Sequence, residues 1–139
     1  MPELPEVETI ARALRPDLTG AEILDADVRW ARTLAVPSVK KFKEQIRGQK
    51  ILEVGRRAKF IHIQLSAYSL FVHLRMSGDL FIKGKTDSPE KHDRLRLFLS
   101  NETILVFNDT RKFGRVWLTD DPTSVIGNLG PEPFSDEFT

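Results

Sequence analysis

The stretch Phe60-Ile61-His62-Ile63-Gln64-Leu65 places an isoleucine or leucine at every second position, and Arg94-Leu95-Arg96-Leu97-Phe98-Leu99 does the same. A period of two is the spacing at which the side chains of a β-strand share one face. Further short apolar runs, bounded by turn residues, occur at 70–74, 80–82, 103–107 and 116–118. Many short strands without long crossover helices favour antiparallel sheets packed as a sandwich, so we expect a mainly β domain.

Two helices are expected to flank this sandwich. The first has a helical stripe of apolar side chains and stop signals at Pro16 and Gly20; the stripe comprises Val7, Ile10, Ala11, Leu14 and Leu18. Pro37-Ser38 opens the second, shorter helix, and Gly48 ends it. Between the helices, residues 23–30 alternate as a strand, with Ile23, Asp25 and Asp27 predicted on one face. The fold prediction is therefore a two-sheet antiparallel β-sandwich with an N-terminal helix and a second short helix.

Composition limits the function classes more than it selects among them. The chain has 139 residues, 40% hydrophobic and 29% charged, which is typical of one globular domain. It contains no cysteine and no apolar run near the ~20 residues of a membrane span, so disulfides, thiolate zinc sites and membrane insertion are not expected. The net charge is only +1, but basic residues dominate 40–59. That run fits either a phosphate-binding face or an ordinary solvated surface.

The N-terminal residues Met1-Pro2-Glu3-Leu4-Pro5-Glu6-Val7-Glu8-Thr9 carry a possible nucleophile. Once Met1 is removed, Pro2 has a free secondary amine, which can attack an aldehyde-like carbon and give an iminium ion. An α-amine titrates near ~8, so part of it is neutral at physiological pH. Glu3 could move protons beside it, with Glu6 one turn further on. Alternatively, these residues are an ordinary chain start whose glutamates favour the helix dipole.

The run from Pro2 to Thr9 resembles the N-terminal signature of the formamidopyrimidine-DNA glycosylase family. Leu4 favours this branch over the related endonuclease VIII branch, which usually has glycine there. The resemblance implies a β-sandwich with flanking helices and a bifunctional DNA glycosylase and AP lyase acting on oxidised purines. By that match Pro2 attacks C1′ of the damaged nucleotide, Glu3 manages protons, and Glu6 supports the site.

Other motifs follow in the family's order. Arg56-Arg57-Ala58-Lys59-Phe60 resembles a stretch whose lysine contacts the phosphate beside the lesion, which gives Lys59 a catalytic role. His73-Leu74-Arg75-Met76-Ser77-Gly78 resembles the family's His-Leu-Gly-Met-Ser-Gly turn, with Arg75 in place of glycine. The match implies DNA binding by His73 and insertion of Met76 into the gap left by a flipped nucleotide.

Two loops complete the resemblance. Pro89-Glu90-Lys91-His92-Asp93 resembles a loop in which the position of His92 touches the DNA backbone. Asp109-Thr110-Arg111-Lys112-Phe113-Gly114 resembles Asp-Pro-Arg-Arg-Phe-Gly, which implies that Arg111 contacts the orphan cytosine or a phosphate and that Phe113 wedges between bases.

The resemblance also implies a domain division. Residues 1–127 correspond to the catalytic domain, and 128–139 to the start of the linker to a helix-two-turn-helix and zinc-finger part. No metal or cofactor is expected in this chain, since the family's zinc finger would follow it. The expected partner is double-stranded DNA with an oxidised purine or abasic site, bound by a monomer in the bacterial cytoplasm. Two alternatives remain: a catalytically weak or inactive DNA-binding module of the same fold, and an N-terminal-proline tautomerase, whose proline begins a strand.

Overall fold

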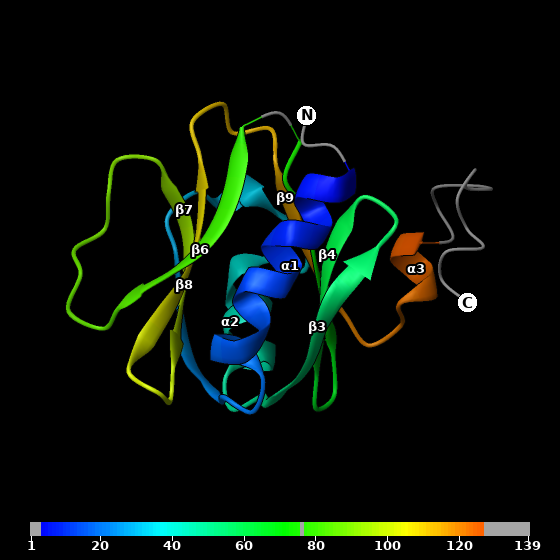
Figure 1. Cartoon of the computed structure of the whole chain (residues 1–139). Helices are drawn as coiled ribbons and strands as arrows, with labels where there is room; N and C mark the ends of the chain where they lie inside the picture. Colours follow the sequence, from blue (N-terminus) through cyan, green and yellow to red (C-terminus); the bar gives the residue numbers. More distant parts are fainter. Residues whose placement is uncertain (1–3, 76, 127–139) are drawn as a thin grey trace.

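The strands of the computed structural model form two facing sheets (Figure 1), and the structure describes residues 4–75 and 77–126. The four-stranded sheet has the order β1 (Ile23–Val28), β7 (Asp93–Leu99), β8 (Thr103–Asp109), β6 (Gly78–Gly84). The five-stranded sheet has the order β2 (Leu34–Val36), β9 (Arg115–Thr119), β5 (Ser69–His73), β4 (Phe60–Leu65), β3 (Ile51–Arg57). This confirms the predicted sandwich, although the short β2 runs parallel to β9.

The alternating stretches supply the core between the sheets. Ile61, Ile63 and Leu65 of β4 are fully buried, and Leu95, Leu97 and Leu99 of β7 are at most 3% exposed. All six belong to the main hydrophobic cluster. The residues between them point to the outer faces of the sheets, as the period of two predicts.

The first predicted helix is α1 (Leu4–Leu18), which contacts β3 and β4 of one sheet and β6 of the other. Figure 1 shows it crossing the open side of the sandwich. Its predicted stripe faces the core, with Ile10 partly buried and the other four side chains buried. Pro16 was wrongly predicted to end the helix, which continues to Leu18 before Gly20 takes a positive φ of 90°. Proline removes one backbone donor, and here the last turn forms around it.

The second predicted helix is α2 (Val39–Ile46), capped by Ser38, whose hydroxyl accepts a hydrogen bond from Lys41 N. Phe42 and Ile46 of this helix are fully buried. Three short elements were not predicted: a 3-10 helix, η1 (Ala31–Thr33), the strand β2, and α3 (Thr123–Ile126). No helix among the described residues is long and apolar enough to cross a membrane.

Two strand predictions were wrong. In β1 the register with β7 shifts between Ile23 and Asp25, so Ile23 and Ala26 are buried instead of falling on opposite faces. A β-bulge has this effect because the extra residue reverses the alternation. The strand β3 was missed because its second half contains Arg56 and Arg57, which were interpreted as the approach to β4.

The topology also divides the basic run at 40–59. Lys50 precedes β3 and Lys59 follows it, and a seven-residue strand separates its ends by roughly 20 Å. Lys50 and Lys59 of the basic run therefore lie at opposite ends of β3. These two lysines are too far apart to contact the same phosphate.

Candidate active site and nucleic-acid interface

One end of the sandwich gathers most of the predicted site residues. The strand register places the pairs Arg57–Phe60, His73–Arg115, Gly78–Asp109 and Asp93–Asn108 at the strand ends on this side. Two connections cross here from one sheet to the other, namely the β5–β6 turn and the loop 110–114 between β8 and β9. Figure 1 shows these loops beside the N-terminal end of α1. Sites built from loops on a rigid scaffold are common in enzymes and nucleic-acid-binding proteins.

Lys59 lies in the tight turn that joins β3 to β4. Its side chain is exposed, whereas the preceding Ala58 is buried and has a φ of 55°. Arg56 ties this turn to α1, because its Nη1 donates to Ala58 O at 3.1 Å and its Nε lies 3.7 Å from Glu8 Oε2. The exposed Glu6 is in the first turn of the same helix. This linkage places Lys59 at the end of the sandwich where α1 begins.

Arg111 and Phe113 lie in the loop 110–114, and both are exposed, Phe113 by 51%. The loop is held from inside by Asp109, whose carboxylate accepts hydrogen bonds from Gly114 N at 2.6 Å and Arg111 N at 3.2 Å. It is held from outside by Lys112, whose Nζ lies 4.1 Å from the centroid of the Trp30 ring. The loop therefore presents one cationic and one aromatic side chain from a fixed backbone.

Gly114 is required by its surroundings. A Cβ at this position would lie 2.4 Å from Phe107 Cζ and 3.0 Å from Asp109 Oδ2. Gly78 is similar, since a Cβ there would lie 2.4 Å from Leu74 O across the β5–β6 turn. Both glycines thus permit a close backbone approach.

His92 precedes β7, and its Nδ1 lies 3.3 Å from Arg94 Nη2. A guanidinium has donors and no acceptor, so Nδ1 accepts this hydrogen bond and the ring proton of the neutral form is on Nε2. His92 is half-buried, so part of the ring still meets solvent. A ring N–H at Nε2 can donate to a phosphate oxygen.

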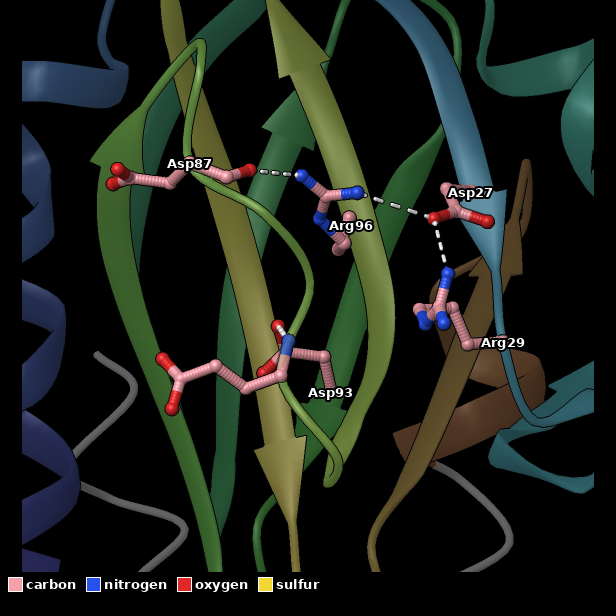
Figure 2. Close-up of polar contacts among 6 residues, drawn as sticks. Asp27, Arg29, Asp87, Asp93 and Arg96 are labelled. Carbon is pink, nitrogen blue, oxygen red and sulfur yellow. Dashed lines mark hydrogen bonds and ion pairs between the residues drawn. The ribbon is translucent and has the colours of Figure 1, made fainter.

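The loop 85–92 that leads to His92 is fixed to the outer face of the four-stranded sheet (Figure 2). Arg96 Nη2 donates to Asp87 O at 2.8 Å, and its Nη1 lies 3.4 Å from Asp27 Oδ2. Closer to His92, the carboxylate of Asp93 accepts from Glu90 N at 2.8 Å. These contacts explain how a polar loop between two strands reaches a defined conformation.

His73 differs from the exposed site residues. Its ring lies 5.4 Å from that of Phe60, and its Nε2 is buried with no hydrogen-bond partner among the described residues. Burial lowers the pKa of His73 to about 4, helped by the charges of Arg75 and Lys59. The ring therefore faces the outer side of the five-stranded sheet as a neutral group, and its contact with DNA stays a prediction.

A second histidine, His62, shares this outer face and was not predicted to lie near His73. His62 stacks on Phe71 with centroids 4.7 Å apart, and its Nε2 is also buried without a partner among the described residues. Burial lowers its pKa to about 4, with a smaller effect from Arg57. The alternation of Phe60, His62 and Gln64 was visible in the sequence, but the sequence did not show which strand would pair with this one.

Three predicted residues, Pro2, Glu3 and Met76, lie outside the described residues, as does the segment 128–139. Among the others, Lys59, His92, Arg111 and Phe113 are at the same end of the sandwich, with Glu6 at the start of α1. Residues that the sequence prediction missed are Arg56, Arg94 and Asp109, which hold the others in place. Each of these residues is a buried or half-buried charged side chain next to a motif residue, and this burial can be recognised only in the fold. No cluster of three or more potential metal ligands occurs among the described residues.

Comparisons with known proteins identify the family of the chain. A family model described as "Formamidopyrimidine-DNA glycosylase N-terminal domain" matches residues 1–116. Formamidopyrimidine-DNA glycosylases from Yersinia enterocolitica and Pelotomaculum thermopropionicum are 48% and 45% identical to the chain, and each match covers 100% of this chain and 52% of the relative. The chain thus spans about half the length of these relatives.

Solved structures show the same fold. The crystal structure of Lactococcus lactis Fpg (MutM) with DNA containing FAPY-dG has a TM-score of 0.84 and 29% identity, over 91% of this chain and 48% of that chain. The same protein in complex with DNA containing an abasic site also has a TM-score of 0.84, over 92% of this chain and 48% of that chain. The sandwich, the motif order and these matches together show that the chain belongs to the formamidopyrimidine-DNA glycosylase family, through its N-terminal domain.

Proposed function

We propose that this chain is the catalytic domain of a DNA glycosylase with AP lyase activity that acts on oxidised purines in duplex DNA. The observation that carries the proposal is the gathering of Lys59, His92, Arg111 and Phe113 at the end of the sandwich where α1 begins. These side chains supply a cation, a hydrogen-bond donor, a second cation and an apolar wedge. That combination suits phosphate contacts and the support of a flipped nucleotide.

In the proposed reaction, the neutral amine of Pro2 forms a bond to C1′ as the bond from C1′ to the damaged base breaks. Glu3 supplies and accepts the protons needed for base release and opening of the sugar ring. The resulting iminium acidifies the C2′ protons. Loss of one proton and departure of the 3′ phosphate complete β-elimination, with Lys59 near the developing charge on the leaving oxygen.

The link through Arg56 supports this assignment. It connects Glu8 of α1 to Ala58 O in the turn that carries Lys59, and so joins the helix next to the proposed nucleophile to the proposed phosphate contact. Reacting groups must be held within a few tenths of an ångström to be effective. A partly buried arginine with partners on both elements is suited to that role.

Crystal structures of the related Lactococcus lactis Fpg with FAPY-dG DNA and with abasic-site DNA support damaged DNA as the partner. Any zinc finger would belong to a further part of the protein, as the resemblance implies. The tautomerase alternative is disfavoured because the first element here is a helix and not a strand. A DNA-binding module without catalysis remains the alternative, and retention of Met1 would favour it because acylated Pro2 has no nucleophilic amine.

Borohydride trapping tests the proposal. The chain with Met1 removed, verified by intact mass, should form a covalent adduct with an abasic-site oligonucleotide after reduction, because an iminium is converted to a stable amine. The control is the same chain with an N-terminal extension that acylates Pro2 and leaves every other residue unchanged. Trapping at full yield in the extended form would assign the amine elsewhere, with Lys59 as the first candidate. No trapping in either form would favour the non-catalytic alternative.

A further inference from the structure

A buried carboxylate lies at the point where the two sheet-crossing connections meet. Asp109 is 1% exposed, and its carboxylate accepts from the hydroxyl of Ser77 in the β5–β6 turn. It also accepts from Gly114 N at 2.6 Å and Arg111 N at 3.2 Å in the loop 110–114. Arg111 N is shared with Ser77 Oγ, also at 3.2 Å. One side chain therefore holds both crossing connections.

Arg94 extends this contact to the third loop. It is 8% exposed, and its Nε donates to Asp109 O at 2.9 Å while its Nη2 donates to His92 Nδ1. The backbone completes the link, since Asp109 N donates to His92 O at 3.0 Å. The loop of His92 is thus joined to the same residue as the other two connections.

These contacts connect segments that are far apart in the sequence. Ser77 and Asp109 are separated by 32 positions, and Arg94 and Asp109 by 15. A buried charged group is costly unless it is hydrogen-bonded, and here every bond goes to a loop that carries or adjoins a predicted DNA contact. A requirement of stability alone would be met by apolar residues.

We propose that Asp109 and Arg94 form a positioning hub, defined as these two residues, that holds the β5–β6 turn, the loop 110–114 and the end of the loop at His92 in one mutual arrangement. Its relevance to DNA rests on the proposed function. In that setting the hub fixes the separation between the β5–β6 turn at Ser77, the predicted wedge Phe113 and the predicted backbone contact at His92. A flipped nucleotide needs its neighbours held apart at one spacing, so loosening the hub weakens capture of duplex DNA before it affects the chemistry.

Amide hydrogen exchange tests the hub without reference to activity. Asp109→Asn keeps the side-chain volume, but its single carbonyl oxygen cannot serve both Ser77 and Gly114. We expect exchange at Gly114 and at Gly78, in the two crossing connections, to become faster together by on the order of tenfold, because a hydrogen bond to a charged group is lost.

Two further variants sharpen this test. Asp93→Asn is the matched control, since Asp93 is a buried carboxylate at the same end of the neighbouring strand β7 and, within the described part of the chain, accepts from Glu90 N and Asn108 Nδ2 instead of from the crossing connections. It should leave Gly78 and Gly114 unchanged. Ser77→Ala removes only the link to the turn and should change Arg111 and Gly78 more than Gly114, which gives a readout if Asp109→Asn does not fold.

Arg94→Met tests the third connection. At a pH high enough for a neutral imidazole, the nitrogen chemical shifts of the His92 ring should report the tautomer protonated at Nε2 in the parent chain, and a mixture of the two tautomers in Arg94→Met. Acceleration at Gly114 alone in Asp109→Asn, or an unchanged His92 tautomer in Arg94→Met, would overturn the hub.

Trapping then connects the hub to function. Asp109→Asn should reduce borohydride trapping on a duplex abasic site by on the order of tenfold, the loss of one charge-assisted hydrogen bond. Trapping on a single-stranded oligonucleotide with the same abasic site should remain within about twofold of the parent, because no base pair has to be opened in that substrate. An equal loss on both substrates in a folded variant would overturn the positioning role in DNA capture. Absence of trapping in the parent chain would instead count against the proposed function, and the exchange and tautomer results would still decide the hub.

Discussion

Two neutral histidines on the outer face of the five-stranded sheet should make the domain sensitive to acid. His62 and His73 pack against Phe71 and Phe60, and each has a buried Nε2 without a hydrogen-bond partner among the described residues. Burial is the main reason that the pKa of each is lowered to about 4, and nearby cations add to it. Protonation would place a charge among aromatic rings with no acceptor to stabilise it.

The direction of the effect follows from the two states. In the unfolded chain each histidine takes up a proton as the pH falls through about 6.5, whereas in the folded chain it does so only near 4. The unfolded state therefore binds more protons between these values, and stability present above pH 6.5 is lost as the pH falls toward 4. A pKa difference of this size is worth on the order of 3 kcal/mol per ring. Since both rings keep partial contact with solvent, we expect about 1 to 2 kcal/mol for each.

Urea unfolding at several pH values between 7.5 and about 4.5 measures this effect. Replacing His62 and His73 together by phenylalanine keeps aromatic packing and removes the titration. As the pH falls over this range, the parent chain should lose about 1 to 3 kcal/mol more free energy of unfolding than the double variant. This is less than the full effect of both rings because the range stops above pH 4. His92→Gln, which removes the third histidine, controls for a general effect of losing histidine. Parallel curves for the parent and the double variant would show that the two rings are protonated equally in both states and would refute the reasoning.

Two further predictions concern the site loops. Arg75 is exposed and has a φ of 58°, a backbone conformation that glycine adopts without strain. The free energy of unfolding of Arg75→Gly should therefore be about 0.5 to 1 kcal/mol higher than that of Arg75→Ala, which also lacks the charge but keeps the strained backbone. Equal thermal unfolding midpoints for the two variants would contradict this. Gly114→Ala should destabilise the domain by about 1 to 3 kcal/mol in urea unfolding, because its Cβ would overlap Phe107. Gly55→Ala, whose Cβ would meet nothing within 4 Å, is the control, and an equal cost at both positions would reject the close-approach explanation.

Local periodicity predicted the parts of the fold in which neighbouring residues decide the structure. The alternation in β4 and β7 and the helical stripe of α1 all became core, because a regular element exposes one face and buries the other. The exceptions have local causes that periodicity does not report. The bulge near Asp25 reversed the faces of β1, and the helix continued past Pro16.

The strand β3 shows a different limit. Its charged half was not interpreted as a strand because Arg56 and Arg57 do not resemble β residues in isolation. In the fold, Arg56 faces α1 and reaches Glu8, and Arg57 lies beside Phe60 at the hairpin end. The segment is a strand because it pairs along its length with β4, which local propensity does not report, and the contact of Arg56 with Glu8, 48 positions away, adds to this pairing.

The sequence predicted which residues belong to the candidate site, but not the contacts that hold them in place. Resemblance identified Lys59, His92, Arg111 and Phe113, and the structure places them at one end of the sandwich. The family resemblance assigned no role to Arg94 or Asp109, because their importance depends on contacts between distant segments.

The loop 110–114 shows how these two kinds of residue divide one motif. The residues that are expected to meet DNA, Arg111 and Phe113, are exposed, whereas Asp109 and Gly114 on either side are buried and fix the backbone between them. The positions at which this chain departs from the pattern it resembles, Thr110 and Lys112, are both exposed, and Lys112 contacts Trp30 instead of the hub. Substitution is thus confined to positions that the buried contacts leave open. This division explains how Thr110 and Lys112 can replace the residues of that pattern without disturbing the contacts of Asp109 that hold the loop.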